Sequence, residues 1–386
     1  MKLLRRAGLV IFLLLVVAVL VAPSVVDSHF NKTLQKAPYR ISGTAGALHK
    51  NLMVADLHAD SLLWGRDLLS RSGHGHVDIP RMQEGNVAIQ AFTVVTKTPH
   101  GLNINSNTGA TDEIRRLAIV EHWPPRTWNS LVERALYQAE RLNGFAEDSD
   151  GDFTILQSGE DVRNFLKRRE GNSKLTAGFL GIEGAQAMEG KLENLDRLYE
   201  AGYRMMSPSH FFDTEIGGSA AGAKKGGLTP FGREWVRRME EKRMIIDLAH
   251  ASAATMSDVT TMAKRPVLVS HTGVRGTCNN NRNLSDDQLR AVAQTGGLVA
   301  IGFWQTAVCG RDAAAIARAI RYAANVVGVE HVALGSDFDG SVTVPFDASG
   351  MALLTEALMK QGFSNAEIAK VMGGNVVQFL EKQLPD

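Results

Sequence analysis

Short apolar runs of β-favouring residues alternate with longer amphipathic segments along most of this chain. Such alternation is typical of a parallel sheet, because a parallel connection needs a crossover of a dozen or more residues, usually a helix. After Asn51 we expect eight strands: Met53–Leu57, Val87–Val94, Ala177–Ile182, Arg204–Ser209, Met244–Ala249, Pro266–Ser270, Gly297–Phe303 and His331–Ser336. Eight strand–helix units in a chain of 386 residues predict an α/β fold, a TIM (β/α)8 barrel with insertions.

The segments between these runs carry helical signals. Amphipathic stretches predict helices at Thr229–Lys242, Ser285–Gln294 and Arg311–Val327. Ser285 followed three residues later by Gln288 fits a capping box, which places a helix start at this point. The main insertion is expected at Thr111–Asn143, a largely amphipathic region interrupted by the sequence WPPR.

The N-terminus departs from the alternating pattern. Three basic residues within the first six positions precede an uncharged, almost wholly apolar run of 16 residues, Ala7–Ala22. A basic flank before an apolar stretch is typical of an export signal, and this run falls just short of the ~20 residues of a spanning helix. Because Pro23 spoils the obvious cleavage site, we expect residues 1–26 to be an uncleaved anchor, with a cleaved signal peptide as the alternative.

The N-terminal pattern predicts the order of the domains and the cellular compartment of the barrel. Residues 27–50 are polar and without a clear period, so we expect a linker there, followed by the barrel domain at residues 51–386. A basic flank stays in the cytoplasm, so the barrel is expected on the exported side of a cell envelope, periplasmic or extracellular. A cleaved signal would instead leave it secreted.

Composition removes several other classes of protein. Lys and Arg number 42 against 41 Asp and Glu, a net charge of +1, which gives no concentrated basic patch for nucleic acid. Apolar residues at 44% and charged residues at 22% are ordinary for a globular protein and exclude a disordered chain. The two cysteines, Cys278 and Cys309, cannot form a CxxC zinc site or a disulfide framework, and whether they pair with each other stays open.

Metal-ligand residue types follow most of the expected strands directly. These residues are His58, Asp60, Glu183, His210, His250, His271 and Asp337. The carboxyl ends of all barrel strands lie at one face, where catalytic side chains gather from several strands. The sequence therefore predicts a metal site at this face of the barrel.

Each of these residues also has a structural interpretation. His58 and Asp60 form a common HxD pattern, and a lone histidine at a strand end is more often a satisfied polar residue than a ligand. Asp56 could support His58 or could be a buried structural carboxylate. His74 and His76 lie among glycines, so a solvated turn is expected there. The joint placement of these residues at the ends of different strands favours function for the set as a whole.

An ordered set of motifs then points to a particular family. The chain contains DLHAD, HVDIPR, GIEGA, SPSHF, IIDLAH, SHTG, NRNLSDDQL, GSDFDG and GFSNAEIAKVMGGN, in this order. Spread from Leu52 to Leu380, this set resembles the membrane dipeptidase (renal dipeptidase) family of metallopeptidases. Two departures leave the side-chain specificity open: the segment FFDTEIGGSA after His210, and Trp304 where mammalian members have a tyrosine.

The resemblance implies a barrel of the metal-dependent hydrolase type with two zinc ions per chain, and it assigns each site residue. It places His58 and Asp60 on the first zinc ion, His250 and His271 on the second, and Glu183 as the bridge between them. It also implies that His210 and Arg282 hold the substrate and that Asp337 lies beside the metal-bound water.

General chemistry supports hydrolysis of dipeptides by such a binuclear site, with a metal-bridging water as the nucleophile. His210 could then donate to the developing oxyanion, Arg282 could clamp the free carboxylate of the peptide, and Asp337 could accept and return the proton. Asp339, two residues further on, competes for this last function. The alternatives are an amidohydrolase acting on N-acyl amino acids or lactams, and a non-catalytic exported binding protein. A homodimer stays open as an oligomeric state.

Overall fold

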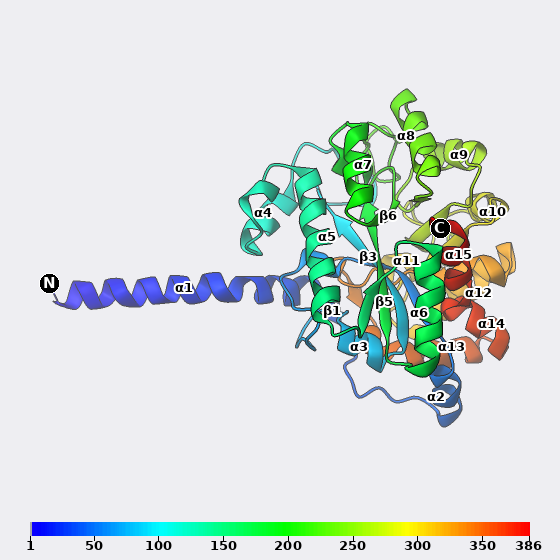
Figure 1. The fold of residues 1–386 in the computed structure, drawn as a ribbon, viewed down its shortest axis with the longest axis horizontal. Coiled ribbons are helices and arrows are strands. Elements are labelled where there is room, and N and C mark those ends of the chain that lie inside the picture. The colour runs from blue at the N-terminus through cyan, green and yellow to red at the C-terminus, as the bar shows by residue number, and fades with distance from the viewer. Residues whose placement is uncertain (1) are drawn as a thin grey trace.

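Eight parallel strands form the inner wall of the fold in a computed structural model that describes residues 2–386 (Figure 1). The strands are β2 (Val54–Ala59), β3 (Val87–Val95), β5 (Thr176–Glu183), β6 (Tyr203–Met206), β7 (Ile245–Ile246), β8 (Leu268–Thr272), β9 (Leu298–Ile301) and β10 (Val332–Leu334). Hydrogen bonds join them in the order β7-β6-β5-β3-β2-β10-β9-β8, and a bridge between Asp247 and Leu268 connects the two ends. The expected barrel is confirmed.

The strands lie where the apolar runs predicted them because both faces of each strand are buried. Every residue of β2, β3 and β5 is buried. Strands covered on both sides have no polar face, so they appear in the sequence as continuous apolar runs. A short additional strand, β4 (Phe153–Ile155), pairs with β5 outside this ring.

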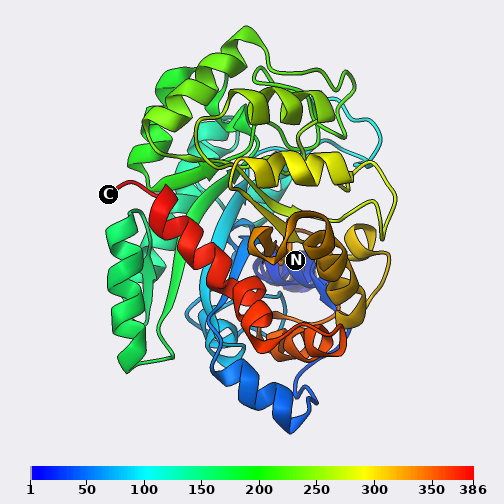
Figure 2. The same cartoon turned by 90° about the vertical axis from the view of Figure 1, so that its right-hand side faces the viewer.

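Helices surround the barrel as an outer layer (Figure 2). The larger ones are α5 (Leu131–Asp148), α6 (Gly159–Gly171), α7 (Leu192–Glu200), α8 (Pro230–Glu241), α9 (Ala253–Met262), α10 (Asp286–Gln294), α12 (Ala313–Val327), α13 (Met351–Lys360) and α15 (Asn375–Gln383). The shorter ones are α3 (Ile79–Glu84), α4 (Glu113–Val120), α11 (Gln305–Val308) and α14 (Asn365–Ala369). The three expected helices are present, and α10 begins with the Ser285–Gln288 capping box. The expected insertion forms α4 and most of α5.

The N-terminal helix α1 (Lys2–Phe30) projects away from the barrel (Figure 1). Over Leu4–Phe30 its mean hydropathy reaches 3.2, and the most apolar stretch is not buried. By length and composition this helix can cross a membrane, a test that a signal sequence near the N-terminus also passes.

The segment expected as a linker is instead packed against the barrel. Asp27 forms a buried ion pair with Arg66, 2.7 Å between carboxylate and guanidinium. The following residues form β1 (Lys32–Thr33), which pairs with β11 (Thr343–Val344), and α2 (Gly43–Lys50). The linker expectation does not hold for this segment, because scattered polar and apolar contacts and the pairing of β1 hold it, and such contacts leave no apolar period in the sequence.

Candidate metal centre

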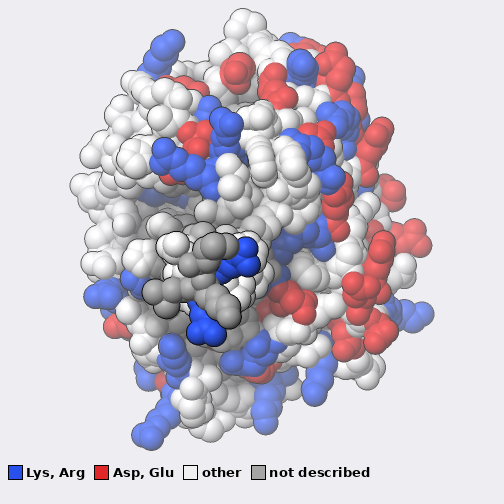
Figure 3. All heavy atoms as spheres, turned by 90° about the vertical axis from the view of Figure 1, so that its left-hand side faces the viewer, with Lys and Arg blue, Asp and Glu red and all other residues white. Residues whose placement is uncertain are grey.

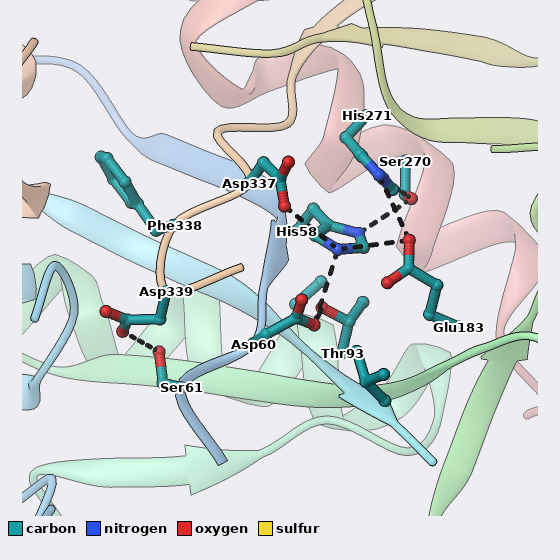
Figure 4. Close-up of polar contacts among 12 residues, drawn as sticks. His58, Asp60, Ser61, Thr93, Glu183, Ser270, His271, Asp337, Phe338 and Asp339 are labelled. Carbon is teal, nitrogen blue, oxygen red and sulfur yellow. Dashed lines mark hydrogen bonds and ion pairs between the residues drawn. The ribbon is translucent and has the colours of Figure 1, made fainter. Parts of the chain in front are cut away.

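Seven of the predicted site residues converge at the carboxyl ends of the strands. Figure 4 shows His58, Asp60, Glu183, His271 and Asp337 among them. Their ligand atoms form three groups, each with all atoms within 4.8 Å of one another: His58, Glu183 and His271; Glu183, His210 and His250; His58, Asp60 and Asp337. Six of the side chains are buried, and that of Asp337 is 13% exposed. The barrel therefore brings together residues that are up to 279 positions apart by their numbers, 337 − 58 = 279.

Glu183 lies at the middle of this cluster. Its Oε1 atom is 2.9 Å from Nε2 of His250 and 3.2 Å from Nε2 of His271. Its Oε2 atom is 3.2 Å from Nε2 of His210. Because Glu183 is the last residue of β5, its side chain reaches over the barrel mouth towards the ends of the neighbouring strands.

His58 faces carboxylates on three sides. Its Nε2 atom is 3.6 Å from Oδ1 of Asp60, 3.8 Å from Oε1 of Glu183 and 3.9 Å from Oδ1 of Asp337. These distances exceed hydrogen-bond length, so within the described residues His58 Nε2 has no hydrogen-bond partner. Glu183 Oε1 has none either, because the nearby imidazole nitrogens of His250 and His271 do not have the geometry of hydrogen bonds to it. Buried polar atoms are normally paired, so these two atoms indicate a site for another ligand.

The donor set identifies what kind of ligand fits. Imidazole nitrogens and carboxylate oxygens together suit zinc and neighbouring divalent transition metals. Three carboxylates buried in one centre also need positive charge to offset their mutual repulsion. The residues present therefore fit metal ions.

Burial and neighbouring charges shift the pKa values of several groups in this cluster. Burial raises the pKa of Glu183 well above its usual value and raises the pKa of Asp337 to about 7. Burial alone would lower the pKa of His58, but Glu183 and Asp60 raise it to about 10. A cation is thus strongly favoured at the position of His58 Nε2.

The other three histidines behave in the opposite way. Burial, together with positive charge on His58 and Arg282, holds the pKa values of His210, His250 and His271 well below the usual value. These imidazoles are neutral near pH 7, and a neutral imidazole has the lone pair that a metal ion requires.

A second layer of polar residues orients the histidines. Ser270 Oγ donates to Oδ2 of Asp247 over 2.6 Å and lies 3.1 Å from Nδ1 of His58 and 3.0 Å from Nδ1 of His271. Since the hydroxyl has one hydrogen, it accepts from both imidazoles, which leaves each Nε2 pointing into the site. Thr93 donates to Oδ1 of Asp60 over 2.7 Å. Sequence reasoning missed Ser270, Asp247 and Thr93, although each is a polar residue in or beside an apolar run.

Asp337 and Asp339 have different surroundings. Asp339 pairs with Arg66 over 2.6 Å, accepts from Ser61 over 2.6 Å and accepts from the backbone of His76 over 2.6 Å. Asp337 instead faces His58, so of the two carboxylates only Asp337 belongs to the cluster. The expectation of a solvated turn is wrong for His76, which is fully buried beneath this network.

Asp56 has a structural position. Its carboxylate accepts from the backbone and hydroxyl of Ser336, both over 2.7 Å, and from Gln90 over 2.7 Å. These bonds tie β3 and the segment after β10 to the neighbouring strand β2. The structural alternative for Asp56 is therefore correct, and support of His58 comes from Ser270.

Arg282 reaches the cluster from the loop between β8 and α10. Its Nη2 atom donates to the carbonyl of His271 over 2.9 Å and lies 3.2 Å from Nε2 of His250. The guanidinium also lies over the ring of Trp304, 5.5 Å from its centre. A disulfide between Cys278 and Cys309 joins this loop to the end of α11, which answers the pairing that the sequence left open.

A cavity of about 250 Å³ opens above the cluster. Its lining includes Arg282 and every residue of the cluster except His58, together with apolar side chains such as Leu102, Ile104 and Leu117. His250 and Asp337 both adopt positive φ angles, 62° and 63°. Such backbone conformations are uncommon outside glycine and gather at functional sites, where surrounding contacts hold them.

A parallel barrel with buried histidines and carboxylates at its catalytic face defines a metal-dependent hydrolase class. Residues 43–384 match the model of the membrane dipeptidase family, peptidase family M19, and the chain belongs to this family. The protein is thus a metallodipeptidase by class.

Relatives agree with this membership. The chain is 30% identical to dipeptidase aclJ of Aspergillus oryzae over 80% of this chain and 70% of that protein. It is 28% identical to an uncharacterised dipeptidase of Schizosaccharomyces pombe over 79% of this chain and 72% of that protein.

Solved structures show the same fold. The crystal structure of dipeptidase AC superposes with a TM-score of 0.72 at 24% identity, covering 87% of this chain and 99% of that one. A metallopeptidase from Rhodobacter sphaeroides was crystallised with a phosphinate mimic of the dipeptide L-Ala-D-Ala. Its structure superposes with a TM-score of 0.71 at 22% identity, covering 86% of this chain and 99% of that one.

Proposed function

We propose that this protein hydrolyses dipeptides at a binuclear zinc site in which Glu183 bridges the two ions. His58 and Asp60 would hold one ion, and His250 and His271 would hold the other. The observation that carries this proposal is the position of Glu183 Oε1, which lies 3.8 Å from His58 Nε2 on one side and 2.9 Å from His250 Nε2 on the other. A single carboxylate between two imidazole groups is the arrangement that a shared metal ligand requires.

The chemistry then divides among few groups. Bound zinc ions would supply an activated water near neutral pH and a Lewis acid for the peptide carbonyl. His210 Nε2, beside Glu183, can donate a hydrogen bond to the carbonyl oxygen as negative charge develops there. Asp337 can take the proton of the attacking water and pass it to the departing amine.

Substrate length follows from the shape of the cavity. Arg282 is buried in the lining of the cavity, where its guanidinium can bind a free carboxylate through paired hydrogen bonds. A cavity of about 250 Å³ has little room beyond one short peptide. Both features favour dipeptides with a free C-terminus over longer chains.

The site of action is proposed from the N-terminal helix and the disulfide. The helix α1 is apolar enough to anchor the chain in a membrane, and a disulfide persists mainly in oxidising compartments. The barrel would then lie on the exported side of the cell envelope. Cleavage of α1 as a signal peptide would release it instead.

Metal content and substrate choice test the proposal together. The full-length protein, reconstituted with zinc and freed of excess metal, is expected to contain about two zinc ions per chain by elemental analysis. The same sample should hydrolyse dipeptides, including L-Ala-D-Ala, faster than matched tripeptides or N-acyl amino acids. A content clearly below two would overturn the bridged site. Preference for N-acyl amino acids would overturn the substrate class and support the amidohydrolase alternative.

A further inference from the structure

The helix α1 joins the catalytic face of the barrel without a spacer. Val26 packs against a cluster that includes Leu63 and Trp64 from the β2 end of the barrel and Ile114 from α4. The next residue, Asp27, is buried in its ion pair with Arg66. The helix is therefore held to this face by both apolar and ionic contacts.

The length of the uncharged part of α1 matches a bilayer. Residues Ala7–Val26 contain no charged side chain, and 26 − 7 + 1 gives 20 residues. At about 1.5 Å per residue this segment spans about 30 Å, the thickness of the hydrocarbon layer. The first charged residue after it is already part of the barrel, so no length of chain remains to hold the barrel away from the membrane surface.

Exposed apolar side chains of the barrel lie on segments near this helix. Among the described residues outside α1, the large hydrophobic side chains that are exposed are Leu34 at 41%, Leu102 at 43% and Ile119 at 46%. Leu34 follows β1, Leu102 lies in the loop after β3, and Ile119 is on α4. All three segments belong to the region where α1 meets the barrel, which is where a membrane-facing surface is expected.

Basic residues accompany these apolar side chains. Lys32, Lys36 and Arg115 are exposed on β1, the loop after it and α4. Figure 3 shows the face from which α1 projects, with Lys and Arg side chains on several sides of the helix and many acidic side chains towards one edge. Apolar residues mixed with cations suit the headgroup layer of an anionic membrane.

The cavity of the site opens on this same face. Leu102 lines the cavity, as do Ser341 and Val342, which lead into β11 beside β1. We propose that the catalytic face of the barrel rests on the bilayer that α1 crosses, with Leu34, Leu102 and Ile119 at the depth of the lipid headgroups. Substrate then reaches the site along the membrane surface. This proposal depends on retention of α1 and is independent of the peptidase chemistry.

Fluorescence quenching by lipids tests this orientation. Because both native cysteines are paired, a label can be attached at Leu34→Cys or Ile119→Cys, with Ser173→Cys as the control. Ser173 is exposed and precedes β5, at the opposite end of the barrel. The full-length variants are placed in phosphatidylcholine–phosphatidylglycerol vesicles that contain headgroup spin-labelled lipid. We expect quenching at positions 34 and 119 to exceed that at 173 by at least about twofold.

Two results would overturn the proposal. One is equal or absent quenching at all three positions in protein shown to be inserted. The other is a mature protein whose N-terminus, by sequencing from the membrane fraction, begins beyond Ala22. Dipeptide hydrolysis by the same samples in detergent is the separate readout for the proposed function, so either proposal can fail while the other stands.

Discussion

Asp337 and Asp339 differ by two positions and have the same side chain, yet their environments separate them completely. Asp339 is enclosed by Arg66 and by hydrogen bonds, and burial, which would raise its pKa, is outweighed by these partners, which lower it. Asp337 lies against His58 and lines the cavity, where burial raises its pKa to about 7. The carboxylate of Asp339 is therefore suited to hold structure, and that of Asp337 is suited to exchange a proton.

The first prediction at this scale concerns Asp337→Asn. Asparagine tolerates the positive φ of this position, so the backbone is expected to persist. The amide cannot accept the proton, and kcat for a dipeptide should fall by about 10²- to 10⁴-fold while zinc content stays near that of the wild type. The matched control is Asp339→Asn, which should lower the melting temperature but leave kcat of the folded enzyme nearly unchanged. Loss of zinc from Asp337→Asn would mark Asp337 as mainly a ligand.

Ser270 provides a second prediction, for a residue that positions others. In Ser270→Ala, the Nδ1 atoms of His58 and His271 lose their common acceptor, and Asp247 loses a donor. Groups of this kind typically contribute about 10- to 100-fold in metal affinity, so the dissociation constant for zinc should rise by that factor. Competition with a chelating dye measures it. Ser270→Thr keeps the hydroxyl and should restore most of the affinity; equal weakening in both variants would refute the hydrogen-bonding explanation.

Arg282 gives the third prediction. Removal of the guanidinium in Arg282→Ala should reduce kcat/KM for free dipeptides by at least about 100-fold, because a paired carboxylate contact is lost. C-terminally amidated dipeptides lack that carboxylate, so their smaller kcat/KM should change much less. Arg282→Lys keeps the charge without the planar guanidinium, so its kcat/KM for free dipeptides should lie between those of the wild type and Arg282→Ala. Similar losses on free and amidated substrates would show that Arg282 does not bind the C-terminus.

At the scale of elements, the sequence located the buried strands but not the segment before them. Strands such as β3 and β5 are apolar throughout, and their runs are visible without any tertiary information. The segment before them is instead held by isolated contacts, such as Asp27 with Arg66, Asn31 with Ser341 and the pairing of β1 with β11. A contact between residues about 40 or more positions apart leaves no local pattern, which is also why Ser270 and the burial of His76 were missed.

A pH-dependent contact of α2 gives the fourth prediction. His49 lies between Thr355 on α13, 2.9 Å from Nδ1, and the carbonyl of Gly85, 3.0 Å from Nε2. Burial lowers the pKa of His49. The neutral form is thus favoured in the folded protein, so its stabilising effect is complete above about pH 6.5 and is lost as pH falls through the lower folded-state pKa. Between pH 7.5 and 5.5, the melting temperature of the wild type should fall by about 1–2 °C more than that of His49→Gln. An equal fall in melting temperature for the wild type and His49→Gln would mean that protonation of His49 is not coupled to folding.

At the scale of the whole molecule, the barrel gathers several carboxylates at one face and also buries them there. Closure through Asp247 and Leu268 brings the strand ends together, and this closure forces Asp60, Glu183 and Asp337 into one buried centre. Removing carboxylates from water is costly unless they are paired with cations. Within the described residues, His58 and Arg282 are the positive groups that act on this centre. The stability of the entire fold is therefore expected to depend on what occupies it.

Metal removal is the prediction that follows. A ligand that binds only the folded state at 1,000 times its dissociation constant stabilises by about 4 kcal/mol, so stripping zinc with a chelator should lower the melting temperature by several degrees or more. Differential scanning calorimetry of holo and chelated protein measures this, and added zinc should restore the original value. The matched variant is Glu183→Gln, which removes the shared carboxylate. Its chelated form should melt at no lower a temperature than chelated wild type, because one buried charge is gone. Added zinc should raise its melting temperature by less than it raises that of the wild type. The contrary outcome is that chelation leaves the melting temperature of the wild type unchanged while elemental analysis shows that the metal has left. In that case the buried carboxylates are balanced by His58 and Arg282 alone, and metal binding is not linked to folding.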